Sequence, residues 1–241
     1  IRAQRMFEHH GVPKSAVENF VRAAAWHGER NPEAVAYRQP FDPDTYRSSR
    51  WISEPFRLFD CSRENDGAGA LLVVSAERAK DMKKKPVHIL AVAQGAARGW
   101  GDLLENDDDD QYATAGFKAV ARRLWAQSGL TPTEIDVAQV YENFSAQGVA
   151  SLIDHGFCDY ESVGEFCAFE NLIAPGGKWP INTSGGNLSQ GFIHGIGMPV
   201  EAVRVLRGES ANPVPGARTC LLAGGPGAPT VSSAIFSTTL T

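Results

Sequence analysis

Apolar residues recur at helical spacing in several stretches of the chain. Val17, Phe20, Val21 and Ala24 form one apolar helix face, and a capping box at residues 13–18 is predicted to open this helix. Further helices are predicted at about 113–127, at Phe144–His155 and at Val200–Leu206.

Short apolar runs bounded by turn residues alternate with these helices and predict strands. They lie at Leu58–Asp60, Ala70–Val74, Val87–Ala93, Ile135–Val140, Thr219–Ala223 and Ser232–Thr238. The run at Ala70–Val74 follows a turn at residues 66–69 and predicts a buried strand. The alternation of helices and strands indicates an α/β fold with a mixed sheet.

The most informative stretch is residues 181–197, INTSGGNLSQGFIHGIG. It predicts the end of a short strand, then a tight glycine turn at residues 184–187. A helix is predicted to follow, with Gly191 and Gly195 one turn apart so that another backbone can approach, and with a tolerated kink at Pro199. Such a turn leaves N–H groups free for an oxyanion, a thioester oxygen or a phosphate.

Composition and charge exclude several classes of function. The 241 residues are 43% apolar, which is enough for a sizeable core, and the net charge of -5 argues against nucleic acid as a partner. The acidic run at residues 107–110 lacks the alternating ligands and the glycine of a calcium loop. No apolar run approaches the roughly 18–20 residues of a membrane span.

The cysteines and most histidines give no indication of a metal site, and we expect none. The cysteines show no C-x-x-C spacing, which favours a reducing cytoplasm: Cys61, Cys158, Cys167 and Cys220. Five histidines lack metal-ligand spacing and predict structural or surface roles: His9, His10, His27, His88 and His155. The chain begins at Ile1, inside a predicted helix and without a methionine, so we expect an N-terminal portion to precede it.

Tyr141, Glu142 and Asn143 follow the strand that is predicted to end at Val140. Ligand sites in α/β folds favour the carboxyl ends of strands. Tyr141 is therefore a candidate proton donor or acceptor, with an ordinary half-buried tyrosine as the alternative. From spacing alone, Glu142 and Asn143 are better explained as caps of the following helix than as catalysts.

His194 and the segment Cys220–Gly227 complete the candidate chemistry. His194 has an imidazole suited to acid/base work near neutral pH, although a histidine inside a helix is more often structural. In CLLAGGPG, a glycine turn follows a strand directly, so its backbone amides can face a ligand. We expect Cys220 to be packed in the sheet, because nothing basic adjoins it in sequence to form a thiolate.

These sites, in this order and spacing, resemble the C-terminal half of the thiolase superfamily. They are more closely similar to the thiolase-like domain of sterol carrier protein X and its bacterial lipid-transfer-protein relatives. Residues 182–186 with residues 193–195 form the most specific motif, and residues 57–70 resemble the family's DGA segment. The resemblance covers essentially the whole chain.

The resemblance implies a layered αβαβα thiolase fold with mixed five-stranded sheets and an incomplete N-terminal half. Residues 1–111 would be the loop region and last strands of the N-terminal half, and residues 112–241 the C-terminal half. It also implies a homodimer, acyl-CoA thioesters as substrates, and a small OB-fold acyl-CoA-binding protein as a partner.

The chain departs from the pattern of ordinary thiolases at three positions. Tyr141 stands where they have the asparagine of an asparagine-glutamate-alanine-phenylalanine motif. Phe192 takes the place of their histidine, with His194 two residues on. Leu221 falls at their second catalytic cysteine, and Cys220 lies one residue early, where its side chain turns to the other face of the strand. Their nucleophilic cysteine belongs to an N-terminal portion outside this sequence.

The altered residues argue against Claisen chemistry, which needs a base and an acyl-carrying thiol. Relatives with such a set are similar to retro-aldolases that trim steroid side chains as CoA thioesters. We therefore expect cleavage of a carbon–carbon bond in an acyl-CoA, with Tyr141 as acid/base and His194 orienting or shuttling the proton. Substrate contacts are expected from Asn143, Gly185, Gly186, Phe192, Gly224 and Gly225.

No cofactor is expected beyond the CoA thioester itself. Two other functions stay open. One is a thiolase that uses an N-terminal cysteine, and the other is a non-catalytic subunit that binds acyl-CoA or lipid.

Overall fold

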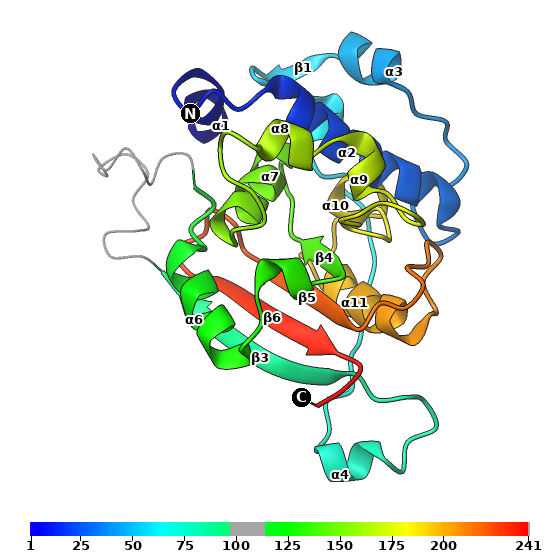
Figure 1. The fold of residues 1–241 in the computed structure, drawn as a ribbon. Coiled ribbons are helices and arrows are strands. Elements are labelled where there is room, and N and C mark those ends of the chain that lie inside the picture. The colour runs from blue at the N-terminus through cyan, green and yellow to red at the C-terminus, as the bar shows by residue number, and fades with distance from the viewer. Residues whose placement is uncertain (97–113, 241) are drawn as a thin grey trace.

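A mixed four-stranded sheet with the strand order β3-β6-β5-β4 lies at the centre of the computed structural model, which describes residues 1–96 and 114–240 (Figure 1). Its strands are β3 (His88–Gly95), β4 (Val137–Val140), β5 (Thr219–Gly224) and β6 (Val231–Ser237). β4 and β5 are parallel, whereas β6 is antiparallel to both β3 and β5. The parallel pair brings the carboxyl ends of β4 and β5 to the same edge.

The predicted mixed sheet is confirmed, with four strands among the described residues where five were expected. Beside β4, Ile181 forms an isolated parallel bridge with Ala138, and the Asn182 N–H donates to the Ala138 carbonyl at 2.9 Å. The predicted strand end at residue 181 is thus a single bridge. β3 lies in the first of the two predicted regions and pairs with β6 of the second. The division at residue 111 itself stays a prediction.

Helices cover both faces of the sheet. On one face, α6 (Lys118–Ser128) packs on β3 and β6, and α7 (Ser145–Asp154) packs between β4 and α2 (Lys14–Arg30). On the other face, α11 (Gly197–Arg207) lies across β4 and β5 (Figure 1). The strand residues alternate accordingly: Leu221 belongs to the larger core with α6 and α7, and Cys220 to the smaller core under α11.

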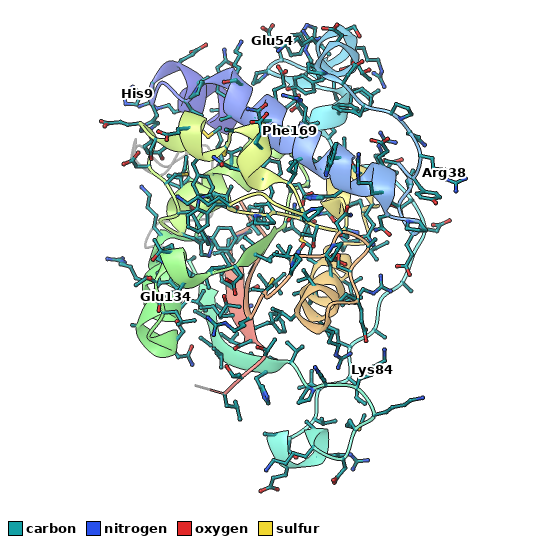
Figure 2. All side chains as sticks on the ribbon, turned by 45° about the vertical axis from the view of Figure 1, so that its right-hand side comes forward. His9, Arg38, Glu54, Lys84, Glu134 and Phe169 are labelled. Atoms are coloured by element: carbon teal, nitrogen blue, oxygen red, sulfur yellow. The ribbon has the colours of Figure 1, made fainter. Side chains whose placement is uncertain are left out.

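The remaining described elements are short. The helices are α1 (Arg2–Glu8), α3 (Pro43–Ser48), α4 (Ala76–Ala79), α8 (Val163–Phe166), α9 (Phe169–Leu172) and α10 (Gly186–Ser189). β1 (Trp51–Ser53) and β2 (Phe56–Arg57) form a small antiparallel hairpin, and 3-10 turns occupy Leu58–Asp60 and Pro132–Glu134. On α9, the labelled Phe169 lies against α2, where its ring meets Trp26 edge-on at 5.9 Å (Figure 2).

Two predicted strands in the first half are wrong. Leu58–Asp60 is a 3-10 turn rather than a strand. Residues 70–74 form no strand, and the side chains of Leu72 and Val73 are each 74% exposed. The segment that carries them, with α4 and Lys84, extends away from the sheet (Figures 1 and 2), so β-propensity alone does not supply a pairing partner.

The predicted capping box of α2 is also wrong. α2 begins after Pro13 without a side-chain cap. The Glu18 carboxylate, expected to cap the helix, instead accepts two hydrogen bonds from the guanidinium of Arg47 at 2.9 and 3.1 Å. A long-range ion pair with Arg47 is therefore formed by Glu18 in place of the predicted capping hydrogen bond within α2. The predicted helix at 113–127 is observed as α6, while residue 113 and the acidic run at 107–110 lie outside the described residues.

The stretch after the glycine turn is not one interrupted helix, as predicted. α10 ends at Ser189, a loop follows, and α11 begins at Gly197. Gly195 lies in this loop at φ 81°, a left-handed conformation that excludes it from a helix. Pro199 therefore falls in the first turn of α11, where its missing N–H is not needed, and no kink has to be explained.

Candidate active site

Tyr141 lies at the tip of β4, on the face of the sheet that α11 covers. Its N–H donates to the Ala223 carbonyl at 2.8 Å, which continues the β4–β5 ladder by one residue. The side chain is half-buried, and burial raises the pKa of the phenol above its ordinary value. Tyr141 is therefore a neutral hydroxyl near neutral pH.

His194 lies in the loop between α10 and α11 rather than in a helix, as the sequence analysis had placed it. Its backbone is left-handed at φ 53°, a conformation that is uncommon outside glycine. The next residue, Gly195, passes so close to Tyr141 that a Cβ built on it would lie 2.6 Å from the ring carbon Cδ2. The loop backbone thus packs against Tyr141 and holds the exposed imidazole beside it.

Tyr141 and His194 line one cavity of about 510 Å³ on the α11 face of the sheet. Gly224 and Gly225, at the end of β5, line the same cavity. The other lining residues are mostly apolar, with three hydroxyl side chains among them: Val92, Gly195, Ile196, Met198, Pro199, Leu222, Ala223, Thr230, Ser232, Ser233 and Ala234. Two ends of the predicted site, 53 residues apart in sequence (141 and 194), therefore meet in space.

Phe192 does not line this cavity but contacts both candidate catalytic rings. Its ring centroid lies 6.1 Å from that of Tyr141, edge-on, and 4.8 Å from that of His194. The Phe192 N–H is shared between Asn65 Oδ1 at 2.5 Å and the Arg63 carbonyl at 3.2 Å. Asn65 thus positions the loop, and the sequence analysis missed it although it lies within residues 57–70, which resemble the DGA segment, directly before the turn at residues 66–69.

Gly185 and Gly186 also lie away from this cavity. Gly185, at φ 103°, packs against the backbone of Gly28 in α2, where a Cβ would come within 2.9 Å of Cα. Gly186, at φ 58°, packs against the carboxyl of Glu142. The glycine turn therefore approaches other backbone and side-chain atoms closely, which is the reason it needs glycine.

Glu142 and Asn143 do not cap the helix that follows them, so that interpretation is wrong. The N-cap of α7 is Phe144, which makes no side-chain cap bond. Asn143 is half-buried, and its carbonyl accepts from the Ser62 N–H at 2.9 Å. Glu142 is fully buried beside the glycine turn. A polar residue that follows a buried strand gives no signal in sequence for this burial.

Cys220 is packed in the sheet, as predicted. It is fully buried in the smaller core beneath α11, and burial raises the pKa of its thiol far above the ordinary value. This thiol does not line the cavity. Among residues 1–96 and 114–240, no group of three or more His, Cys, Asp or Glu side chains could hold a metal ion.

Comparison with known proteins identifies the family of the chain. A model of the "Thiolase C-terminal domain-like" family matches residues 103–238. Over 204 residues, the chain is 41% identical to a 17-hydroxy-3-oxo-4-pregnene-20-carboxyl-CoA lyase of Mycobacterium tuberculosis, covering 85% of this chain and 53% of that protein. Over 231 residues, it is 36% identical to a steroid side-chain-cleaving aldolase of Thermomonospora curvata, covering 95% of this chain and 58% of that protein.

Solved structures give the same result. The "Ltp2-ChsH2(DUF35) aldolase" superposes with a TM-score of 0.91 at 34% identity, covering 98% of this chain and 61% of that one. An acetyl-CoA acetyltransferase from Bacillus anthracis shares the fold at 13% identity and a TM-score of 0.67, covering 98% of this chain and 59% of that one. The chain spans little more than half the length of these curated relatives. No helix within the described ranges is long and apolar enough to cross a membrane.

Proposed function

The chain belongs to the thiolase C-terminal domain-like family, and from this premise we propose that it takes part in the retro-aldol cleavage of acyl-CoA thioesters. The observation that carries the proposal is the single cavity lined by Tyr141, His194 and Gly225. An acid/base pair and a backbone amide at one apolar cavity are what this reaction requires.

The reaction would break the bond between the α- and β-carbons of a β-hydroxyacyl-CoA. A base removes the proton of the β-hydroxyl, and the β-carbon becomes a carbonyl as the bond breaks. The bonding electrons pass to the α-carbon and form a thioester enolate. An acid then protonates the α-carbon, which gives the shortened acyl-CoA. One proton leaves the hydroxyl and one enters at carbon, so the reaction needs no oxidant or reductant.

In this proposal Tyr141 is the acid/base. Because burial raises the pKa of its phenol, Tyr141 enters the cycle protonated: it passes its own proton to the imidazole of His194 as it accepts the proton of the β-hydroxyl, and the imidazolium then supplies the proton that reaches the α-carbon. His194, on the same cavity, orients the substrate hydroxyl or shuttles this proton. Phe192 cannot exchange a proton, and its ring, in contact with both others, keeps their spacing.

The Gly225 amide is the candidate donor to the thioester oxygen. It lines the cavity at φ 78°, and no acceptor for its N–H is found in the described part of the chain. A preorganised donor of this kind is effective against the charge that develops on an enolate oxygen. Gly185 and Gly186 face away from the cavity, so their proposed contact with substrate would have to come from the opposite side of the β4 tip.

The lining of the cavity favours an apolar acyl group. Val92, Leu222, Ala234 and Met198 supply apolar surface from β3, β5, β6 and α11. A volume of about 510 Å³ lies within the range of small-molecule sites. Two relatives are named for reactions on steroid side chains, and we extend the substrate class to a steroid-like acyl-CoA on that support.

Replacing Tyr141 by Phe in the protein that carries this chain tests the proposal. We expect the rate of acyl-CoA cleavage to fall by roughly 10²–10⁴, the usual contribution of a general acid/base. Tyr37→Phe is the matched control, because Tyr37 does not line the cavity. Unchanged cleavage by Tyr141→Phe would exclude Tyr141 from the mechanism.

The other two functions are separate outcomes of this assay. Acyl transfer between CoA thioesters without aldehyde or ketone release would indicate a thiolase that uses a cysteine outside this sequence. Tight binding of acyl-CoA without any product would indicate a non-catalytic subunit. The aldolase is preferred here because Cys220 is sealed from the cavity while two proton-transfer groups line it.

We further propose a homodimer and a small acyl-CoA-binding partner protein. The support for a partner is the similar solved structure, the "Ltp2-ChsH2(DUF35) aldolase", whose name pairs two proteins. Light scattering of the purified protein, alone and with a candidate partner, tests both. A cytoplasmic location, expected from cysteine usage, stays a prediction.

A further inference from the structure

Glu142 directly follows Tyr141, and the two side chains leave the tip of β4 on opposite sides. Tyr141 faces the cavity, whereas Glu142 is turned into the interior and has no exposed surface. Consecutive residues of an extended strand alternate in this way. Whatever fixes the carboxyl of Glu142 therefore also fixes the backbone that carries the phenol of Tyr141.

The carboxyl lies against the turn that leads into α10. The Leu188 N–H is directed at Oε1 from 3.5 Å, and the Asn182 side chain lies beside the same group. Gly186 packs so tightly on Oε1 that any Cβ at this position would overlap it. The other oxygen, Oε2, is buried and has no hydrogen-bond partner among the described residues.

An ionised carboxylate does not fit these surroundings. Within the described ranges, no basic side chain forms a salt bridge with Glu142, and burial raises the pKa of the carboxyl well above its ordinary value. A single buried polar atom without a partner is tolerable, whereas a buried charge without a counter-ion is far more unfavourable. The neutral acid is the form that the site accommodates.

A second contact joins the strand tip to the glycine turn. The Asn182 side chain accepts from the Val140 N–H at 2.8 Å and donates to the Val140 carbonyl at 2.9 Å. Asn182 takes a left-handed backbone, φ 45°, to do so. The tip of β4 is thus fixed to the turn at Val140 by Asn182 and at Glu142 by Gly186 and Leu188.

We propose that Glu142 is a positioning residue that acts as a neutral carboxylic acid and fixes the tip of β4, and with it Tyr141, against the glycine turn. The consequence for catalysis rests on the proposed function of Tyr141. When Glu142 ionises as the pH rises, an unpaired buried charge loosens this contact between the β4 tip and the glycine turn, which we call the joint. Glutamine has nearly the same shape as the neutral acid and cannot ionise, so Glu142→Gln should keep the joint intact at all pH values.

The first test measures unfolding and needs no substrate. Because the folded protein binds this proton more tightly than the unfolded chain does, the wild type loses stability as pH rises above the ordinary carboxyl range. The ratio of the unfolding constants of wild type and Glu142→Gln should therefore rise by up to about tenfold per pH unit, until Glu142 ionises in the folded state. The exposed Glu77→Gln is the control and should give a constant ratio.

Other titrating groups near the joint cancel in this ratio, because both proteins contain them. They are Tyr141 on the same strand tip, and Asp60, Cys61, Arg63 and Glu64 on the segment that runs beside Asn143 and α10. α10 and Asn182 contribute no titratable side chain. A constant ratio for Glu142→Gln would overturn the proposal, because the carboxyl would then ionise alike in both states.

The second test measures cleavage. Glu142→Gln should keep kcat and KM within about threefold of wild type at the pH where the wild type is most active, and lose the fall in kcat that ionisation of Glu142 causes as the pH rises further. Glu142→Ala should lower kcat by a larger factor than it changes KM. A folded Glu142→Gln as inactive as Glu142→Ala at every pH would overturn the proposal, since a charged carboxylate would then be required. An active Tyr141→Phe with the expected unfolding ratio would refute the proposed function alone.

Discussion

The close packing of Gly195 on the Tyr141 ring makes Gly195→Ala the sharpest perturbation of the site. Gly195 has a left-handed backbone at φ 81°, and its missing side chain is the space that the phenol ring occupies. A Cβ at this position would lie 2.6 Å from Cδ2 and 2.8 Å from Cε2 of Tyr141. The substitution therefore acts on the proposed catalytic group without changing any residue that is proposed to move a proton.

The loss in free energy of unfolding that we expect from Gly195→Ala has two parts. A Cβ on left-handed backbone costs about 1–2 kcal/mol. The clash adds about 1–3 kcal/mol, because carbon atoms in contact normally stay about 3.5–4.0 Å apart and the ring has to move by about 1 Å. We expect Gly195→Ala to lower the free energy of unfolding by about 2–5 kcal/mol. A displacement of this size at a reacting group can lower kcat about 10²-fold.

Gly208→Ala separates the two parts. Gly208 ends α11 at φ 72°, and nothing lies within 4 Å of its virtual Cβ. This control should lose only the backbone contribution of about 1–2 kcal/mol and keep kcat unchanged. Urea unfolding measures the stabilities, and acyl-CoA cleavage at saturating substrate measures kcat.

The reasoning is refuted if Gly195→Ala behaves like Gly208→Ala in both measurements. The Tyr141 ring would then not lie against the loop, and the cavity as described would not exist. A loss of stability with full activity would show instead that the ring moves freely without a role in turnover.

Two further predictions concern buried ionisable groups. Burial lowers the pKa of His27 to about 3 and of His155 to about 4, and raises that of Asp154 to about 6. As pH falls from about 6.5 towards 4, the unfolded chain takes up a proton that buried His27 does not, so His27 lowers the unfolding free energy by about 1.4 kcal/mol per unit. Urea titrations of wild type and His27→Gln at several pH values check this: the stability of the wild type relative to the variant should fall by that amount per unit, and a constant difference contradicts it. Asp60→Ala removes the acceptor of the buried Tyr46 hydroxyl, which lies 3.0 Å from Oδ1, and should cost about 2–4 kcal/mol in the same assay. A loss below about 0.5 kcal/mol, typical of exposed sites, would contradict that network.

The fold follows from sequence where local pattern and long-range packing agree. The apolar runs that became β3, β4, β5 and β6 are buried on at least one face, and the positions of these strands match the prediction. The run at residues 70–74 has equal β-propensity but lies exposed and unpaired. A strand needs a neighbouring strand to pair with as well as a suitable composition, and the residues of the segment alone do not show whether such a partner exists.

The same limit applies to the glycine-rich stretch. Its residues alone are compatible with an interrupted helix, because spacing of four between Gly191 and Gly195 satisfies the helical period. What decides against the helix is the Tyr141 ring, 54 residues earlier in the chain (141 and 195), which occupies the place of a side chain at Gly195. Tyr141 and His194 could still be predicted to share a site, because strand tips and glycine turns gather at one edge of such sheets.

Glu142 shows why the burial of a residue beside the candidate site could not be predicted from the sequence. Tyr141 and Glu142 are two polar residues after one buried strand, and alternation dictates only that they face opposite ways. Which of them is buried depends on the turn at residues 182–188, whose backbone reaches the β4 tip only in the folded chain. Cap propensity predicted a helix-capping role for Glu142, whereas the structure places it against Gly186 with no salt bridge to any described residue. A buried acid without a counter-ion is uncommon unless it is neutral. Its place, one residue from the tyrosine that lines the cavity, therefore ties the protonation of an interior group to the geometry of the proposed substrate site.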